Sequence, residues 1–172
     1  KPQFRSLRIL DDILRECPLS KEFDVDTYQR NIMNMYRTFR EFERPFFNVA
    51  FELATGVGKT KLMGAFITYL YTNKGVKNFF VVAPSLTIYS KLKNDLGNPS
   101  VDNEKYVFRG IGCFATETPN VWFDDDYRNR PSSSFSDSDS INIFIFNISK
   151  FNSEERKMMS VNEYLGESFF DY

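Results

Sequence analysis

The fold of this chain is restricted above all by a short glycine-containing segment, Ala54-Thr55-Gly56-Val57-Gly58-Lys59-Thr60. The apolar run before it, residues 46–53, predicts a short buried strand. The residues after it, from Lys59 to about Asn73, place apolar side chains at helical spacing and predict a helix that ends at Gly75. Glycines between a strand and a helix let the backbone turn its N–H groups inward, which suits phosphate oxygens. The segment therefore predicts a phosphate-binding loop within an α/β fold.

Further along the chain, the same alternation of apolar strands and helices continues. Residues 79–83 predict a second buried strand, and a helix is expected from about Leu86 to Leu96. Residues 141–146 predict a third core strand. Apolar strands alternating with helices are typical of a parallel sheet covered on both faces, so we expect a three-layer α/β domain with a mostly parallel sheet.

Two helices are expected before this region. Residues 4–16 carry apolar side chains every three or four positions. A second helix is predicted to start at Asp26, because Asp26 and Gln29 have the spacing of a capping box, and to end near Arg44 and Pro45. Both helices are predicted to be amphipathic.

Other segments carry weaker patterns. Residues 106–108 predict a short strand. Residues 121–123 are interpreted as too short for a strand, so the acidic run that follows, residues 124–126, is interpreted as a loop. The serine-rich residues 132–140 also predict a solvated loop, and a helix is expected from about Ser153.

Composition excludes several classes of function. The chain has 172 residues, enough for one ordinary domain, and it contains no histidine, which excludes histidine-based acid–base catalysis and histidine metal sites. Its two cysteines, Cys17 and Cys113, form no disulfide framework. No apolar run is long enough for a membrane span, so a cytoplasmic protein without a membrane partner is expected. Residues 1–95 hold 15 Lys and Arg against 10 Asp and Glu, and this basic half carries the glycine-containing segment.

The glycine-containing segment suggests specific roles for its residues. Lys59 is expected to reach the β- and γ-phosphates of a nucleotide, and Thr60 to place its hydroxyl on Mg²⁺, so these two are the candidate catalytic residues. Leu53 stands where the strict motif has a glycine. The competing interpretation is a plain helix N-terminus with a surface lysine. The candidate nucleotide-binding residues of the loop are Thr55, Gly56, Val57, Gly58, Lys59 and Thr60.

The segment from Glu52 to Thr60 resembles motif I of superfamily 2 helicases, and Phe79 to Ile88 resembles their motif Ia. The stretches Lys105 to Ile111 and Asn147 to Asn152 look most like the restriction (R) subunit of type III restriction-modification enzymes. The resemblance covers about residues 26–170. It implies a RecA-like P-loop domain that uses ATP and Mg²⁺.

The same resemblance implies further roles and partners. Gln29 would read adenine, because a side-chain amide supplies both a donor and an acceptor, although Gln29 also fits the capping box. Pro84 and Ser85 would contact a nucleic-acid phosphate, although Ser85 also fits a helix cap. The implied partners are double-stranded DNA and a methyltransferase subunit, in an enzyme that translocates on and cleaves foreign DNA.

The expected organisation is an N-terminal helical part, residues 1–44, followed by the first RecA-like ATPase domain, residues 45–172. No Asp-Glu pair of the kind that assists ATP hydrolysis follows an apolar strand, so we expect the domain to be incomplete at its C-terminal end and unable to hydrolyse ATP alone. Three alternatives stay open: a P-loop switch or kinase without DNA activity, a nucleic-acid helicase unrelated to restriction, and an interaction module with a vestigial loop.

Overall fold

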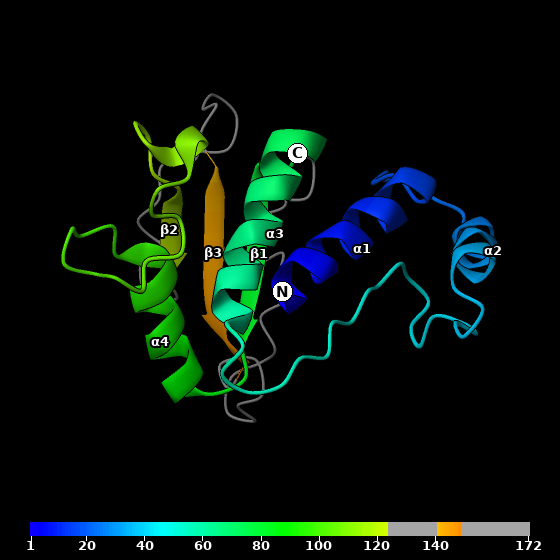
Figure 1. Cartoon of the computed structure of the whole chain (residues 1–172), viewed down its shortest axis with the longest axis horizontal. Helices are drawn as coiled ribbons and strands as arrows, with labels where there is room; N and C mark the ends of the chain where they lie inside the picture. Colours follow the sequence, from blue (N-terminus) through cyan, green and yellow to red (C-terminus); the bar gives the residue numbers. More distant parts are fainter. Residues whose placement is uncertain (124–140, 149–172) are drawn as a thin grey trace, which may run out of the picture. The chain divides into compact units, whose positions relative to one another are not determined.

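The computed structural model describes residues 1–123 and 141–148 (Figure 1). The chain divides into two compact units, Lys1–Phe66 and Ile67–Tyr172, which are described separately below. In chain order, the elements are α1 (Pro2–Glu16), α2 (Val25–Met35), α3 (Lys59–Lys74), β1 (Asn78–Ala83), α4 (Leu86–Gly97), the short 3₁₀ helix η1 (Gly112–Phe114), β2 (Asn120–Phe123) and β3 (Asn142–Asn147).

The first unit is built around helices α1 and α2. Helix α1 confirms the helix predicted over residues 4–16, and it buries Leu10, Ile13 and Leu14. Ile13 packs with Cys17, Tyr28 and Ile32 in one cluster that joins the two helices. Side chains from the segment after α2 surround this cluster, so the aromatic residues there pack against the two helices.

Helix α2 differs from its prediction at both ends. Its N-cap is Asp24, whose carboxylate accepts hydrogen bonds from the backbone N–H groups of Asp26 and Thr27, both at 3.2 Å. Asp26 is therefore already inside the helix, and the predicted capping box of Asp26 and Gln29 is wrong. The helix ends at Met35, because Tyr36 adopts an extended backbone, and it does not continue to Pro45.

The strand predicted over residues 46–53 is also not observed. These residues belong to no strand, and the one sheet of the described residues pairs only β1, β3 and β2. An apolar run becomes a strand only when a neighbour accepts and donates its backbone hydrogen bonds. Here the apolar side chains pack without that pairing: the ring of Phe47 lies 5.5 Å from that of Tyr28, and the ring of Phe51 lies 4.8 Å from that of Phe66.

The second unit contains a three-stranded sheet in the order β1-β3-β2, with both pairs of strands parallel (Figure 1). All six residues of the central strand β3 are buried. Strand β3 confirms the core strand predicted over residues 141–146, and strand β1 confirms the strand predicted over residues 79–83. A central parallel strand is covered on both faces, which explains why its sequence is apolar without alternation.

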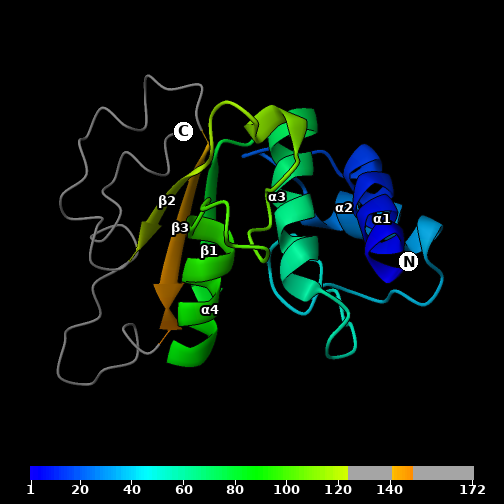
Figure 2. The same cartoon turned by 60° about the vertical axis from the view of Figure 1, so that its left-hand side comes forward.

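Helix α4 lies against one face of this sheet (Figure 2). A Cβ atom added to Gly97 would meet the ring of Phe123 at 2.6 Å, so the last turn of α4 needs a residue without a side chain. The opposite face of the sheet is aromatic, where Phe80 pairs with Phe146 and Trp122 stacks on Phe144. The helix predicted over residues 86–96 is confirmed.

Two predictions for the later part of the chain are wrong. Residues 106–108 form turns rather than a strand, with Tyr106 and Phe108 buried and Val107 N–H bonded to the carbonyl of Asp95 at 2.9 Å. Residues 121–123, interpreted as too short for a strand, belong to β2. They form a strand because all four residues of β2 pair in parallel with residues of the longer strand β3.

An amide ladder joins the amino ends of the three strands. Asn78, Asn142 and Asn120 are aligned in register across the sheet. Asn142 donates through Nδ2 to Oδ1 of Asn78 at 3.1 Å. Its own Oδ1 accepts from Nε1 of Trp122 at 3.2 Å and from Nδ2 of Asn120 at 3.4 Å. The ladder therefore satisfies a buried polar side chain and marks the starting register of all three strands.

Three predicted features lie outside the described residues: the loops over residues 124–126 and 132–140, and the helix from about Ser153. Among the residues that are described, no helix has the length and apolar character needed to cross a membrane.

Candidate nucleotide-binding site

The backbone of residues 54–58 forms the predicted glycine-containing turn before α3. Gly56 has φ +78° and Gly58 has φ +88°. Residues with side chains rarely adopt these values, so both positions favour glycine on conformational grounds. The two glycines of the motif are therefore explained by the turn itself, with the loop leading directly into the first residue of α3.

The N-terminus of α3 gives this turn a positive electrostatic character. The first backbone hydrogen bond at this end runs from the N–H of Leu62 to the carbonyl of Gly58, at 3.0 Å. The N–H groups of residues 59–61 consequently have no acceptor within the helix, as at any helix N-terminus. The first turn contains no acidic residue, and the side chains of Lys59 and Lys61 are exposed. This combination favours an anion such as a phosphate group.

The residues predicted from the sequence occupy consecutive places in this arrangement. Thr55 and Gly56 are exposed in the turn, Val57 and Gly58 are half-buried, and Lys59 and Thr60 are the first two residues of α3. In the described part of the chain, no group of three or more acidic or cysteine side chains is placed to hold a metal ion. A single hydroxyl such as that of Thr60 fits Mg²⁺ in the mode in which phosphates and water supply most of its ligands.

Sequence reasoning missed one residue of this site. The side-chain amide of Gln3, in the first turn of α1, donates from Nε2 to the backbone carbonyl of Val57. A Cβ atom added to Gly58 would lie 3.3 Å from the same Nε2. Gln3 therefore lies directly beside the glycine-containing turn. No local pattern could have indicated this contact, because it joins residues that are 54 positions apart.

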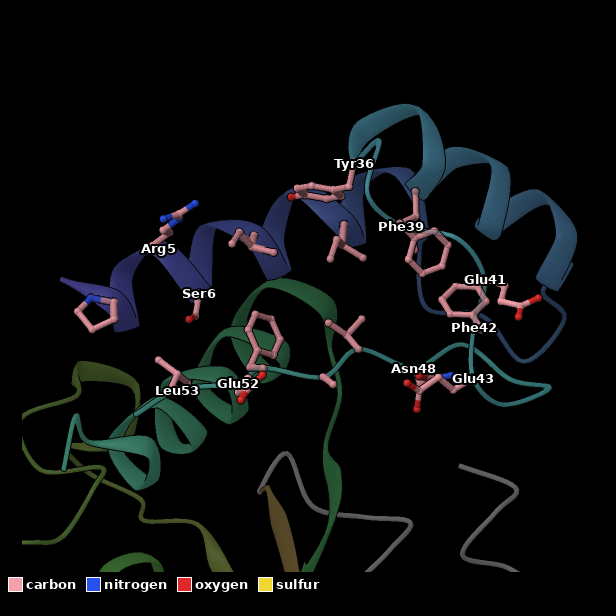
Figure 3. Close-up of a pocket in the computed structure, with 17 residues that line it drawn as sticks. Arg5, Ser6, Tyr36, Phe39, Glu41, Phe42, Glu43, Asn48, Glu52 and Leu53 are labelled. Atoms are coloured by element: carbon pink, nitrogen blue, oxygen red, sulfur yellow. The ribbon is translucent and has the colours of Figure 1, made fainter. Parts of the chain in front are cut away.

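A cavity of about 650 Å³ lies in the same unit, between α1, the end of α2 and the segment that leads to the turn (Figure 3). Apolar side chains such as Ile9, Ile13 and Phe42 form much of its lining, which ends at Leu53, the residue before the turn. Ser6 points from α1 toward the segment that carries Leu53, whereas Arg5 points away from it (Figure 3). The cavity is of the size and character of a small-molecule site.

Comparison with known protein families shows the family of the chain. Residues 22–172 match the family described as the type III restriction enzyme res subunit. The chain belongs to this family. Neither the curated proteins nor the solved structures contain a significant match to the chain. The res subunit family is one of helicase-like, ATP-using P-loop domains, which agrees with the parallel α/β sheet and the glycine-containing turn.

Within this res subunit domain, Gln29 contacts the segment that follows α2. Its Oε1 accepts a hydrogen bond from the backbone N–H of Phe42 at 3.2 Å. Phe42 lines the cavity, whereas Gln29 does not. The structure thus gives Gln29 a contact other than the predicted capping box, and the predicted contact with adenine stays a prediction.

The predicted nucleic-acid contact of the res subunit domain lies in the second unit. Pro84 and Ser85 follow β1 at the carboxyl edge of the sheet, and both are exposed. The Oγ of Ser85 accepts a hydrogen bond from the N–H of Ile88 at 3.3 Å, so Ser85 is the N-cap of α4. The capping role is observed, and the contact with a nucleic-acid phosphate stays a prediction.

Proposed function

We propose that the chain is the ATP-binding part of a DNA-dependent ATPase, the motor of a type III restriction enzyme. The observation that carries this proposal is the turn of residues 54–58, whose two glycines at positive φ lead into the unpaired N-terminus of α3. A triphosphate is the ligand that this arrangement suits, because the N–H groups and Lys59 both favour several negative oxygens in one place.

Each residue of the turn has a proposed role. The backbone N–H groups of residues 55–60 would surround the phosphates, and Lys59 would contact the β- and γ-phosphates as a point charge. The hydroxyl of Thr60 would hold Mg²⁺, which when bound neutralises the charge that develops on the phosphates. Lys59 and Thr60 are accordingly the proposed catalytic residues of the complete enzyme.

The cavity beside the turn is the proposed place for the adenine base. Its volume of about 650 Å³ exceeds that of a purine, and its lining continues to the residue before the phosphate-binding turn. A base in the cavity and phosphates on the turn would therefore belong to one nucleotide. Gln29 does not line the cavity, but its Oε1 bonds to the N–H of Phe42, which does, so Gln29 is the proposed adenine reader at the border of the cavity, with its amide presenting both a donor and an acceptor.

Activity on DNA forms the second part of the proposal, and it is supported by membership of the res subunit family. ATP turnover in the complete enzyme would drive translocation on double-stranded DNA, with a methyltransferase subunit as partner and cleavage of foreign DNA as the outcome. Pro84 and Ser85 would contact a DNA phosphate at the N-terminus of α4. A cytoplasmic location would follow from these partners.

The deciding experiment is a titration of the chain with ATP and Mg²⁺ by calorimetry. We expect Lys59→Ala to weaken binding by at least about tenfold, because a charge-assisted contact to phosphate is lost. Lys61→Ala is the matched control, since Lys61 is an exposed lysine in the same turn of α3. No binding by the unaltered chain at millimolar ATP, or equal losses in the two variants, would contradict the proposal.

A separate measurement concerns hydrolysis. The sequence contains no adjacent Asp-Glu pair, so we expect the 172-residue chain to bind ATP without sustained release of phosphate. Steady ATP turnover by the purified chain, abolished by Lys59→Ala, would show that other acids in this chain complete the catalytic site.

A further inference from the structure

Helix α1 lies before the residues that match the res subunit family, yet it contributes to the nucleotide site. The family match begins at residue 22, whereas α1 ends at Glu16. From α1, Gln3 donates its side-chain N–H to the carbonyl of Val57, inside the glycine-containing turn. The position that a Cβ atom of Gly58 would take is 3.3 Å from this donor, which is a close approach. A helix outside the residues of the family match therefore contacts the turn at the Val57–Gly58 peptide.

The helix that carries Gln3 is firmly held in its unit. Its residues Leu10, Ile13 and Leu14 are buried, and Ile13 belongs to the cluster shared with α2. Ser6 and Ile9, between Gln3 and this anchor, line the cavity. Gln3 is therefore presented by a packed helix rather than by a free terminus, so its amide has a defined place beside the turn.

The geometry of the peptide bond gives this contact a consequence for phosphate binding. A trans peptide is planar, and its C=O and N–H groups point in opposite directions. Holding the carbonyl of Val57 on one side therefore fixes the N–H of Gly58 on the other side. This peptide joins Val57 to Gly58, a glycine with positive φ, and a glycine adopts a wide range of φ values. Without a hydrogen bond to its carbonyl, the peptide could rotate and turn its N–H away from the phosphates.

We propose that Gln3 is a positioning residue for nucleotide binding, which holds the Val57–Gly58 peptide so that the N–H of Gly58 faces the phosphates. The proposal rests on the proposed function, because it requires that the turn binds a triphosphate. It assigns to α1 the task of presetting the phosphate-binding turn before the nucleotide arrives.

The test compares Gln3→Met, which keeps the length of the side chain and removes the donor, with Arg8→Met, an exposed position of α1. Binding of ATP and of inorganic tripolyphosphate, each with Mg²⁺, is measured by calorimetry, and the melting temperature is measured without ligand. We expect Gln3→Met to weaken both ligands by about three- to tenfold, the effect of one lost hydrogen bond. Arg8→Met is expected to leave both affinities unchanged. Without ligand, Gln3→Met and Arg8→Met should have about the same melting temperature. If Gln3 had a purely structural role, Gln3→Met would melt at a lower temperature than Arg8→Met.

Gln3→Glu provides a second variant, because it places a carboxylate oxygen against the carbonyl of Val57. It should weaken tripolyphosphate binding more than Gln3→Met does. Hydrogen exchange of the unaltered chain gives a measurement that needs no variant: tripolyphosphate should slow exchange in α1, since coupling between two sites is reciprocal.

The outcomes separate the two proposals. If the unaltered chain binds neither ATP nor tripolyphosphate, the proposed function fails and this inference fails with it. If the chain binds both and Lys59→Ala abolishes binding, while Gln3→Met binds as tightly as the unaltered chain, only the role of Gln3 is overturned. Absence of any ligand-dependent change of exchange in α1 would also overturn it.

Discussion

Replacing Gln29 by Glu separates two roles that the same side chain can have. The Oε1 of Gln29 accepts a hydrogen bond from the N–H of Phe42 at 3.2 Å, and Phe42 lines the cavity proposed for adenine. A glutamate keeps an acceptor for Phe42, but it lacks the Nε2 donor that N7 of adenine requires. Methionine has a similar length and loses both the donor and the acceptor. The two variants therefore differ in the hydrogen bond to Phe42 and agree in the loss of the donor to adenine.

The expected magnitudes follow from one hydrogen bond in each case. Loss of the contact to adenine costs about 1 kcal/mol, which weakens ATP binding about fivefold. Loss of the bond to the half-buried Phe42 costs about 1 kcal/mol of unfolding free energy, and only Gln29→Met should show this cost. Gln29→Glu should therefore lose ATP affinity with little change in stability.

The assay is calorimetric titration with ATP and with GTP, together with urea unfolding of each variant. The unaltered chain should prefer ATP. Gln29→Met should bind the two nucleotides about equally, whereas Gln29→Glu keeps an acceptor for the N6–H of adenine and should lose affinity for both nucleotides while it still prefers ATP. Asn34→Asp is the matched control for the added charge, because Asn34 is an exposed amide of α2. If Gln29→Glu keeps the affinity of the unaltered chain and Gln29→Met keeps its preference for ATP, Gln29 only supports Phe42 and the adenine contact is refuted.

Three further predictions concern other parts of the structure. Asn142→Val removes the hydrogen bonds of the buried ladder amide and should lower the unfolding free energy measured in urea by about 2 kcal/mol. Asn120→Ala, at an exposed position of the same ladder, should lower it by less than about 0.5 kcal/mol. Equal effects of the two variants would contradict a stabilising role of the ladder. Burial raises the pKa of the Cys17 thiol, so iodoacetamide should label exposed Cys113 in the folded chain and Cys17 only after unfolding, as mass spectrometry of the labelled peptides will show. The hydrogen bond from Thr27 lowers the pKa of the Asp24 carboxyl, so its stabilising effect is lost as the pH falls through that pKa; Asp24→Asn, which does not titrate, should flatten the acid side of the plot of melting temperature against pH.

The sheet could be predicted where the sequence signal is local. Strands β1 and β3 are apolar runs bounded by polar residues, and the pattern of a covered parallel sheet is contained in those runs. Strand β2 could not be recognised, because four residues form a strand only when a neighbour such as β3 pairs with them. The strand predicted over residues 106–108 is not observed. Tyr106 and Phe108 are buried, as they would be in a strand, but the chain around them turns.

The start of α2 shows another limit of local reasoning. Asp24 and Asp26 are both suitable N-cap residues, and a capping box could be written only for Asp26. The choice between them depends on which residues the helix must bury. With Asp24 as the cap, Tyr28 and Ile32 face the cluster around Cys17, one turn apart. That cluster includes Ile13 of α1, so the information that selects Asp24 lies outside the local sequence of α2.

The candidate site could also be predicted only in part from the sequence. The turn of residues 54–58 could be predicted because its glycines, the following lysine and the helix pattern are contiguous. The contact of Gln3 with Val57 and the cavity beside the turn depend on how α1 packs, and no spacing within the chain encodes them. Predictions from motifs therefore reach the residues of the turn and stop at the residues that contact it from α1.

The amide ladder connects the register of the sheet with the proposed DNA contact. Asn78 and Asn142 are paired at the amino edge, and a shift of one residue between β1 and β3 would separate them. The same register pairs Ala83 with Asn147 at the other edge, so β1 and β3 end together. Ligands of open parallel sheets bind beyond the carboxyl ends of the strands. Ser85, two residues after β1, therefore stands at the edge where a ligand of this sheet is expected, and the ladder at the opposite edge sets that position.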